Sequence, residues 1–134
     1  MYPLAILIGG PTASNKTKLA FEIQSKISSF IVNADSMQVY DQLQTLTNLP
    51  SEQELKKHSC NLFGYIRYPN KCNLGVWFND VKNVLSKSPN KVPIFVGGTG
   101  MYLDSLCGEI SKIPSIPERI NSKIEQLYNS LGNR

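Results

Sequence analysis

The stretch LAILIGGPTASNKTKLAFEI, residues 4–23, changes from an apolar run to a polar loop and then to a helical pattern. The apolar run predicts a strand over residues 3–9, and the pattern after the loop predicts a helix over residues 16–28. Such strand–loop–helix turns direct backbone N–H groups and a helix N-terminus at an anion. The spacing fits the phosphate-loop pattern G-x-x-x-x-G-K-[ST], except that Asn15 replaces the second glycine.

This loop predicts a phosphate site, in which Lys16 neutralises phosphate oxygens and the Thr17 hydroxyl binds Mg²⁺. The residues expected to bind phosphate or nucleotide are Gly10, Pro11, Thr12, Ala13, Ser14, Asn15, Lys16 and Thr17. The glycine that Asn15 replaces usually has a positive φ, where a Cβ costs about 1–2 kcal/mol. Because asparagine tolerates that region, we expect Asn15 to weaken phosphate binding without abolishing it. The alternative is a glycine turn followed by an incidental Lys-Thr pair.

The composition is that of an ordinary globular domain, with 134 residues, 41% apolar and 18% charged. The sequence has neither an apolar run of membrane-spanning length nor the features of a signal peptide, so we expect a cytoplasmic protein. The net charge is +4, but Lys56-Lys57 is the only pair of adjacent basic residues in the sequence. This scattered charge favours a solvated surface over a nucleic-acid patch. Three cysteines without C-x-x-C spacing favour packed thiols over a metal site.

Strand and helix patterns alternate along the rest of the chain. Strands are expected over 30–35, 61–68 and 92–98, helices over 73–87, 100–107 and 117–131, and an irregular connection with a helical turn over 36–50. Ser51 and Glu54 form a capping-box signature for one further short helix. This alternation predicts a parallel sheet covered by helices, with ligands at the carboxyl ends of the strands. Polar residues follow three strands, at Gly10–Thr17, Asp35–Gln38 and Thr99, so we expect them to meet at one edge.

Three stretches together resemble the tRNA dimethylallyltransferases, also called tRNA isopentenyltransferases. They are GPTASNKT (10–17), NADSMQVYDQL (33–43) and VPIFVGGTGMYLDSL (92–106). The corresponding family patterns are G-P-T-A-S-G-K-[ST], D-S-M-Q-V-Y and V-G-G-T-G-x-Y. The resemblance implies a P-loop NTPase-like three-layer α/β fold with a parallel sheet, incomplete in this chain. It implies that residues 1–112 are the N-terminal part of the core and that 113–134 begin a helical tRNA-binding insertion.

The resemblance further implies transfer of a dimethylallyl group from dimethylallyl diphosphate to N6 of the adenosine 3′ of the tRNA anticodon. Asp35 would be the general base, although an Asp-Ser pair can also cap the following turn. Thr99 would place its hydroxyl near the diphosphate or its metal, and it can also be the N-cap of the helix 100–107. The residues expected to bind tRNA are Asp35, Ser36, Met37 and Gln38, whereas Tyr102 and His58 are interpreted as structural.

Three functional hypotheses remain open. The first is a transferase in truncated or split form, which a separate C-terminal fragment would complete. The enzymes of the family are expected to be monomers. The second is another phosphate-loop enzyme such as a small kinase. The third is an inactive phosphate-binding remnant, which Asn15 in the phosphate loop supports. A further departure from the family is its T-A-K-P-S pattern, which reads TNLPS here, with Leu49 in place of a basic residue. The last helix has an apolar stripe of Ile120, Ile124, Leu127 and Leu131, which predicts an exposed apolar surface and self-association.

Overall fold

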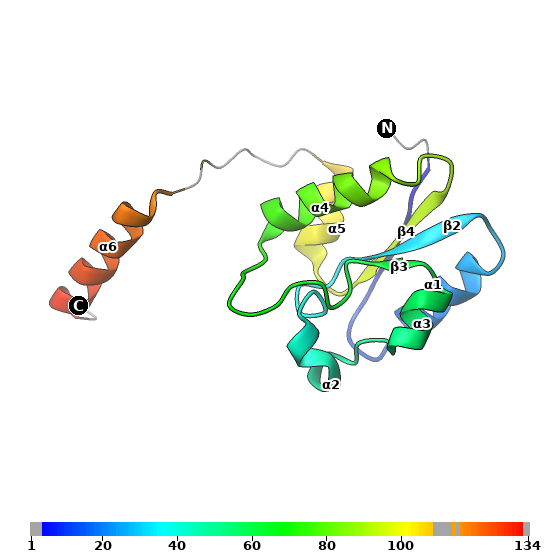
Figure 1. Ribbon diagram of the computed structural model, residues 1–134, viewed down its shortest axis with the longest axis horizontal. Coiled ribbons are helices and arrows are strands. Elements are labelled where there is room, and N and C mark those ends of the chain that lie inside the picture. Colours follow the sequence, from blue (N-terminus) through cyan, green and yellow to red (C-terminus); the bar gives the residue numbers. More distant parts are fainter. Residues whose placement is uncertain (1–3, 109–113, 115, 133–134) are drawn as a thin grey trace.

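The computed structural model describes residues 4–108, 114 and 116–132. Its sheet contains β1 (Ile6–Gly9), β2 (Ser29–Asn33), β3 (Cys60–Asn61) and β4 (Val92–Gly97). The strand order is β1-β4-β2-β3, and each neighbouring pair is parallel. The parallel sheet expected from the sequence is therefore confirmed, with its carboxyl ends along one edge (Figure 1).

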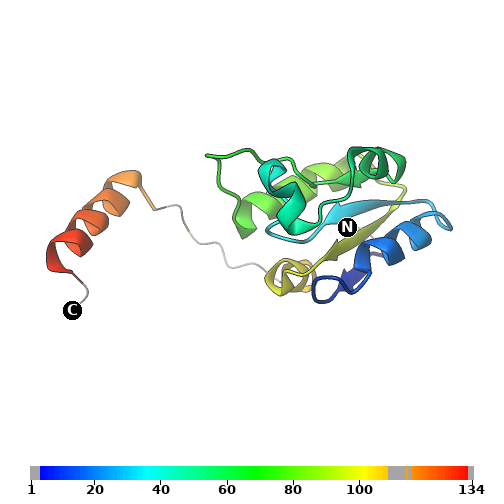
Figure 2. The ribbon, with the colours of Figure 1, turned by 90° about the horizontal axis from the view of Figure 1, so that it is seen from below.

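The helices gather around this sheet, except for the last one, which stands apart from it in both views (Figures 1 and 2). They are α1 (Lys16–Gln24), the 3₁₀ turn η1 (Asp41–Leu43), α2 (Gln44–Thr47), α3 (Glu52–Lys57), α4 (Leu74–Ser86), α5 (Gly100–Cys107) and α6 (Glu118–Leu131). The irregular connection expected over 36–50 contains η1 and α2. The helix expected over 16–28 ends earlier, at Gln24. Just beyond this end, the Ser25 hydroxyl donates to the Glu22 carbonyl at 2.7 Å.

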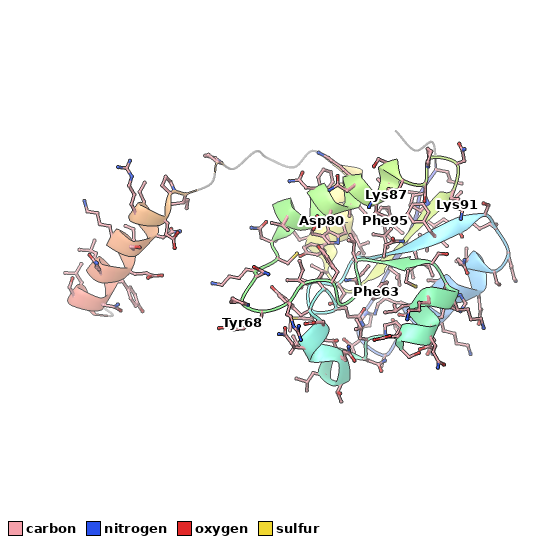
Figure 3. The ribbon with its side chains drawn as sticks, in the orientation of Figure 1. Phe63, Tyr68, Asp80, Lys87, Lys91 and Phe95 are labelled. Atoms are coloured by element: carbon pink, nitrogen blue, oxygen red, sulfur yellow. The ribbon has the colours of Figure 1, made fainter. Side chains whose placement is uncertain are left out.

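Both faces of the sheet are buried, which explains why β2 and β4 are apolar along almost their whole length. Phe30, Val32 and Phe95 form one cluster with Trp77 and other side chains of α4 and α5. Residues between them, including Ile31, Ile94 and Val96, form a second cluster with side chains of α1 and α3. Alternate residues of a strand point to opposite faces, so these two clusters make three layers. Figure 3 labels Phe95 of the first cluster and Phe63 of the second.

The prediction of a strand over 61–68 is mostly wrong. β3 has two residues, and beyond it Ile66 makes only an isolated parallel bridge with Tyr40. Leu62 has a φ of 62° and Gly64 a φ of 54°, so the backbone leaves the extended region directly after the strand. A strand requires negative φ at every residue, and these two positions end it.

The short helix predicted from Ser51 and Glu54 is confirmed as α3. The Ser51 hydroxyl accepts the Glu54 N–H at 3.3 Å, and a Glu54 carboxylate oxygen accepts the Ser51 N–H at 2.9 Å. These two bonds satisfy donors that the first helical turn leaves open. The interpretation of His58 as structural is supported by its ring, which stacks on Phe21 with centroids 4.0 Å apart.

Helix α6 presents the expected apolar stripe to solvent. Its exposed large apolar side chains are Ile120, Ile124, Leu127, Tyr128 and Leu131. The exposed apolar surface is therefore confirmed, whereas the self-association stays a prediction. The expected domain boundary between 112 and 113 lies outside the described residues. Across the described part of the chain, none of the helices has the length and apolar character needed to cross a membrane.

Candidate functional site

The loop between β1 and α1 places two non-glycine residues in the left-handed region. Asn15, the N-cap residue of α1, has a φ of 60° and a ψ of 21°, which confirms the conformation expected of it. Ala13 has a φ of 62°. Nothing in the residue type points to this conformation at Ala13, because alanine offers neither glycine's freedom nor asparagine's local hydrogen bonds. The loop therefore carries strain at two positions instead of one.

Two polar side chains of this loop, those of Ser14 and Lys16, bond to its own backbone. Ser14 Oγ donates to the Pro11 carbonyl at 2.8 Å, and Lys16 Nζ donates to the same oxygen. The ammonium group thus lies across the loop, next to the N-terminus of α1, where unpaired backbone N–H groups favour an anion.

Asp35 lies directly beyond the end of β2, and the two oxygens of its carboxylate accept backbone hydrogen bonds from different segments. Oδ1 accepts the Met37 N–H at 3.0 Å, and Oδ2 accepts the Gly98 N–H at 3.3 Å. The first bond is the turn cap expected as an alternative for this residue, so capping and proximity to the site hold together. The second bond ties the end of β2 to the end of β4.

The Asn33 side chain holds the backbone of Asp35 from inside the protein. Its Oδ1 accepts the Asp35 N–H at 3.0 Å, and its Nδ2 donates to the Asp35 carbonyl at 2.9 Å and to the Leu62 carbonyl at 3.0 Å. Asn33 is fully buried, and its own carbonyl accepts the indole N–H of Trp77 at 2.8 Å. The sequence alone gives no sign of the roles of Asn33 and Trp77, because these roles depend on contacts between distant segments.

Thr99 occupies the N-cap position of α5, but its side chain makes no capping hydrogen bond. Instead, Thr99 Oγ1 accepts the Ser36 N–H at 2.9 Å and donates to Ser36 Oγ at 3.2 Å. The expected capping bond is therefore absent, and the hydroxyl fixes the turn after Asp35. The close approach of the two segments also requires Gly97, whose Cβ would lie 2.1 Å from the backbone of Ala34.

A cavity of about 420 Å³ lies where these segments meet. Its polar lining comes from Thr12, Ser14–Lys18, Asp35, Gln38, Thr47, Asn48 and Glu54, and the rest of its lining from Ala13, Phe21, Leu49, Pro50, Val96 and Gly97. The structure therefore brings the loop from Thr12 to Thr17 together with Asp35 and Gln38. Of the other predicted site residues, Gly10, Pro11, Ser36, Met37 and Thr99 do not line the cavity.

Gln38 does not present a free amide to the cavity. Its Nε2 donates to the Thr47 carbonyl at 2.8 Å and to the Asn48 carbonyl at 3.4 Å, and so holds the segment after α2 against the turn. Met37 is exposed beside it. The amide group therefore shapes the wall of the cavity, and only its oxygen remains for a ligand.

Several cavity residues were missed from the sequence. Phe21 and Leu49 belong to an apolar wall formed by helix α1 and the segment after α2, and a helical stripe or a loop leucine gives no sign of such a role. Glu54 was interpreted only as a capping residue. Hydrogen bonds from the side chain and backbone of Ser51 lower the pKa of Glu54, which keeps it anionic at the rim.

Tyr102 packs in the core, as expected. Its ring stacks on Trp77 with centroids 4.3 Å apart, and burial raises the pKa of its phenol. The three cysteines are free thiols, and burial raises the pKa of Cys60 to about 12. Among the residues that the structure describes, none of the His, Cys, Asp and Glu side chains form a group of three or more suited to a metal ion.

The fold and this site define a P-loop NTPase-like α/β protein with a phosphate loop of altered sequence. The IPP transferase family matches residues 38–134, and the isopentenyl transferase family matches residues 4–62. The chain belongs to the IPP transferase family, which confirms the resemblance seen in its sequence.

Curated relatives and solved structures agree with this assignment. A tRNA dimethylallyltransferase of Rhizobium etli is 43% identical over 90% of this chain and 41% of its own length. One of Hyphomonas neptunium is 41% identical over 98% of this chain and 42% of its own length. The crystal structure of a tRNA delta(2)-isopentenylpyrophosphate transferase from Staphylococcus epidermidis has a TM-score of 0.69 at 26% identity, covering 95% of this chain and 41% of that one.

A tRNA isopentenylpyrophosphate transferase from Bacillus halodurans shares the fold, with a TM-score of 0.73 at 22% identity over 94% of this chain and 43% of that one. The chain therefore spans about two fifths of the length of the curated relatives it matches.

Proposed function

We propose that this chain carries the donor site of a tRNA dimethylallyltransferase. The reaction would transfer a dimethylallyl group from its diphosphate to N6 of the adenosine 3′ of the tRNA anticodon. The observation that supports this most is the cavity itself, in which the Lys16-Thr17 end of the phosphate loop faces Asp35 beside an apolar wall. That pairing suits a ligand with an anionic head and a short hydrocarbon tail.

The phosphate end of the cavity would bind the leaving group. As the allylic C–O bond breaks, its electron pair leaves with the diphosphate, and the growing negative charge needs donors already in place. Lys16 and the backbone N–H groups at the start of α1 would supply them. Phe21, Leu49 and Val96 would surround the five-carbon chain and keep water from the allylic cation character that develops at its first carbon.

Asp35 would accept the proton that N6 loses as the new C–N bond forms. Each of its carboxylate oxygens already accepts a backbone N–H, and each keeps a further lone pair for the amine. These bonds also fix the direction of the carboxylate. Ser36, Met37 and Gln38 would contact the tRNA from the same turn. We assign Thr99 a positioning role, since its hydroxyl acts on Ser36.

The donor set around the phosphate loop fits Mg²⁺. This ion binds oxygen ligands, usually with several waters and the oxygens of a substrate phosphate instead of a full set of protein ligands. Thr17 would contribute its hydroxyl, and the ion would neutralise charge on the diphosphate. The remaining residues of the loop would bind the diphosphate directly.

The domain organisation follows from the same proposal. Residues 1–112 would form the donor-binding core and residues 113–134 would begin a helical tRNA-binding insertion. Helix α6 supports this, because it stands apart from the sheet with its side chains exposed (Figure 2). A protein that acts on tRNA would work in the cytoplasm.

Two observations favour a second candidate, an inactive phosphate-binding remnant. Ala13 and Asn15 strain the loop, and Lys16 already has the Pro11 carbonyl as a partner. Both features would weaken the binding of a phosphate by this loop.

The experiment that tests the proposal is transfer of a labelled dimethylallyl group to an anticodon stem-loop RNA. The wild-type chain should modify the RNA, and Asp35→Asn should lose transfer while it still binds the donor. Phosphorylation of a small acceptor by ATP would favour a kinase instead. Donor binding without transfer at high protein concentration would favour the remnant.

A further inference from the structure

The loop between Ile66 and Cys72 presents an exposed aromatic ring between two cations. Tyr68 is 77% exposed, and Arg67 and Lys71 on either side of it are also exposed. The loop, with the sequence RYPNK over residues 67–71, contains no acidic residue. In Figure 3, Tyr68 points away from the body of the protein.

Hydrogen bonds hold this loop in place at both ends. Ile66 pairs with Tyr40 in a parallel bridge, and the Tyr68 N–H donates to Gln42 Oε1 at 3.0 Å. At the other end, the Cys72 N–H donates to the hydroxyl of Tyr40 at 3.0 Å. Because the backbone is fixed on both sides, the ring of Tyr68 is presented to a partner without a large ordering cost.

The segment that holds the loop follows directly from the turn that carries Asp35. Tyr40 and Gln42 lie shortly after Asp35–Gln38, so the loop projects from the carboxyl edge of the sheet, where the cavity lies. Figure 3 shows Tyr68 on this side, whereas Lys87 and Lys91 lie at the opposite end of α4 and the sheet. Tyr68 therefore lies on the same side of the protein as the carboxyl ends of the strands, where Asp35 follows β2.

Arg67 remains available for a second partner. Its Nε lies 3.5 Å from Asp41 Oδ2, and its side chain is 79% exposed, so this ion pair contributes little. The other oxygen, Asp41 Oδ1, is buried and makes no hydrogen bond in the described part of the chain. Asp41 therefore offsets part of the charge of Arg67, whereas the exposed guanidinium still has donors free for a second partner.

We propose that residues 66–72 form an RNA-contact surface, in which Tyr68 stacks on an unpaired base while Arg67 and Lys71 contact the adjoining phosphates. Aromatic rings and cations in alternation are the features with which proteins bind single-stranded nucleic acid. This inference rests on the proposed function, since it takes the acceptor to be an RNA loop. It assigns this loop to nucleotides next to the target adenosine.

The test measures binding of a fluorescein-labelled anticodon stem-loop RNA to the full chain by fluorescence anisotropy. Tyr68→Ala should raise Kd by about 5- to 150-fold, the range that loss of one base stack produces. Tyr68→Phe keeps the ring and should bind within about twofold of wild type. Circular dichroism of both variants checks that the fold is kept.

The charge contribution is tested with a matched pair of double variants. Arg67→Gln with Lys71→Gln should flatten the dependence of log Kd on log salt by about 0.7 for each phosphate that the protein no longer neutralises. Lys87→Gln with Lys91→Gln removes the same charge from the opposite edge (Figure 3) and should leave the slope nearly unchanged.

The outcomes separate this inference from the proposed function, because binding of dimethylallyl diphosphate is measured independently on the wild-type chain. RNA affinity that falls in Tyr68→Ala and returns in Tyr68→Phe supports the surface, even if the donor does not bind. Unchanged RNA affinity in Tyr68→Ala overturns it and indicates that the ring serves a protein partner or none. Absence of RNA binding by a wild-type chain that binds the donor overturns it as well.

Discussion

The Thr99 hydroxyl accepts the backbone N–H of Ser36 at 2.9 Å, although the two residues are 63 positions apart in the sequence. This bond joins the turn after β2 to the start of α5 and so fixes the backbone next to Asp35. We predict that Thr99→Val, which removes the hydroxyl at nearly constant volume, lowers the free energy of unfolding by about 1–3 kcal/mol, because the Ser36 N–H loses its partner. Denaturant unfolding measures this. Thr99→Ser is the control, and a loss as large as that of Thr99→Val would contradict the role of the hydroxyl.

We predict that substitution of Asn33 lowers the free energy of unfolding more than substitution of any exposed polar residue of the sheet. Asn33→Ala leaves three backbone groups without partners in a partly buried site. We expect a loss of about 3 kcal/mol or more in the free energy of unfolding, at roughly 1 kcal/mol or more for each group. The matched control is Asn61→Ala on β3, whose partly exposed side chain donates to Ile31 and Ser59. Equal losses in the two variants would show that Asn33 has no special role.

The strain in the phosphate loop predicts that glycine stabilises it. Ala13→Gly should raise the free energy of unfolding by about 1 kcal/mol, because the left-handed conformation costs an alanine about 1–2 kcal/mol and glycine loses part of this gain in chain entropy. Asn15→Gly should gain less, since asparagine tolerates this conformation. Thermal unfolding measures both. Ala20→Gly, in the buried face of α1, is the control that should destabilise, and destabilisation by Ala13→Gly would contradict the strain.

The capping box of α3 predicts a dependence on pH. Hydrogen bonds from Ser51 lower the pKa of Glu54 from its ordinary value of 4.5. A carboxyl group with a lowered pKa in the folded state adds stability above the unfolded pKa, and that stability is lost as the pH falls through the folded pKa. Wild type should therefore lose more stability below pH 4.5 than Glu54→Gln does. Parallel stability curves from pH 7 to 3 for the two proteins would contradict this assignment.

Much of the fold could be predicted, because apolar strands alternate with helical patterns and parallel strands end at a common edge. That rule alone predicts that the phosphate loop and Asp35 meet at the cavity, whereas Thr99 contacts Ser36 beside it. The prediction of the strand at β3 failed, because Leu62 adopts a positive φ that leucine rarely takes. The positive φ of Ala13 could not be predicted either, because alanine rarely takes it. The contacts of Asn33 and the cavity wall at Leu49 were also beyond prediction, since they depend on how separate segments pack.

Binding of dimethylallyl diphosphate in the presence of Mg²⁺, measured by calorimetry, tests the donor site most directly. Wild type should bind, and Lys16→Ala should bind about 10- to 150-fold more weakly, which corresponds to the roughly 1.5–3 kcal/mol of a charged hydrogen bond. Lys26→Ala, an exposed lysine beyond the end of α1, should bind as wild type does. No binding by wild type, or equal binding by Lys16→Ala, would contradict the assignment of this cavity as the donor site.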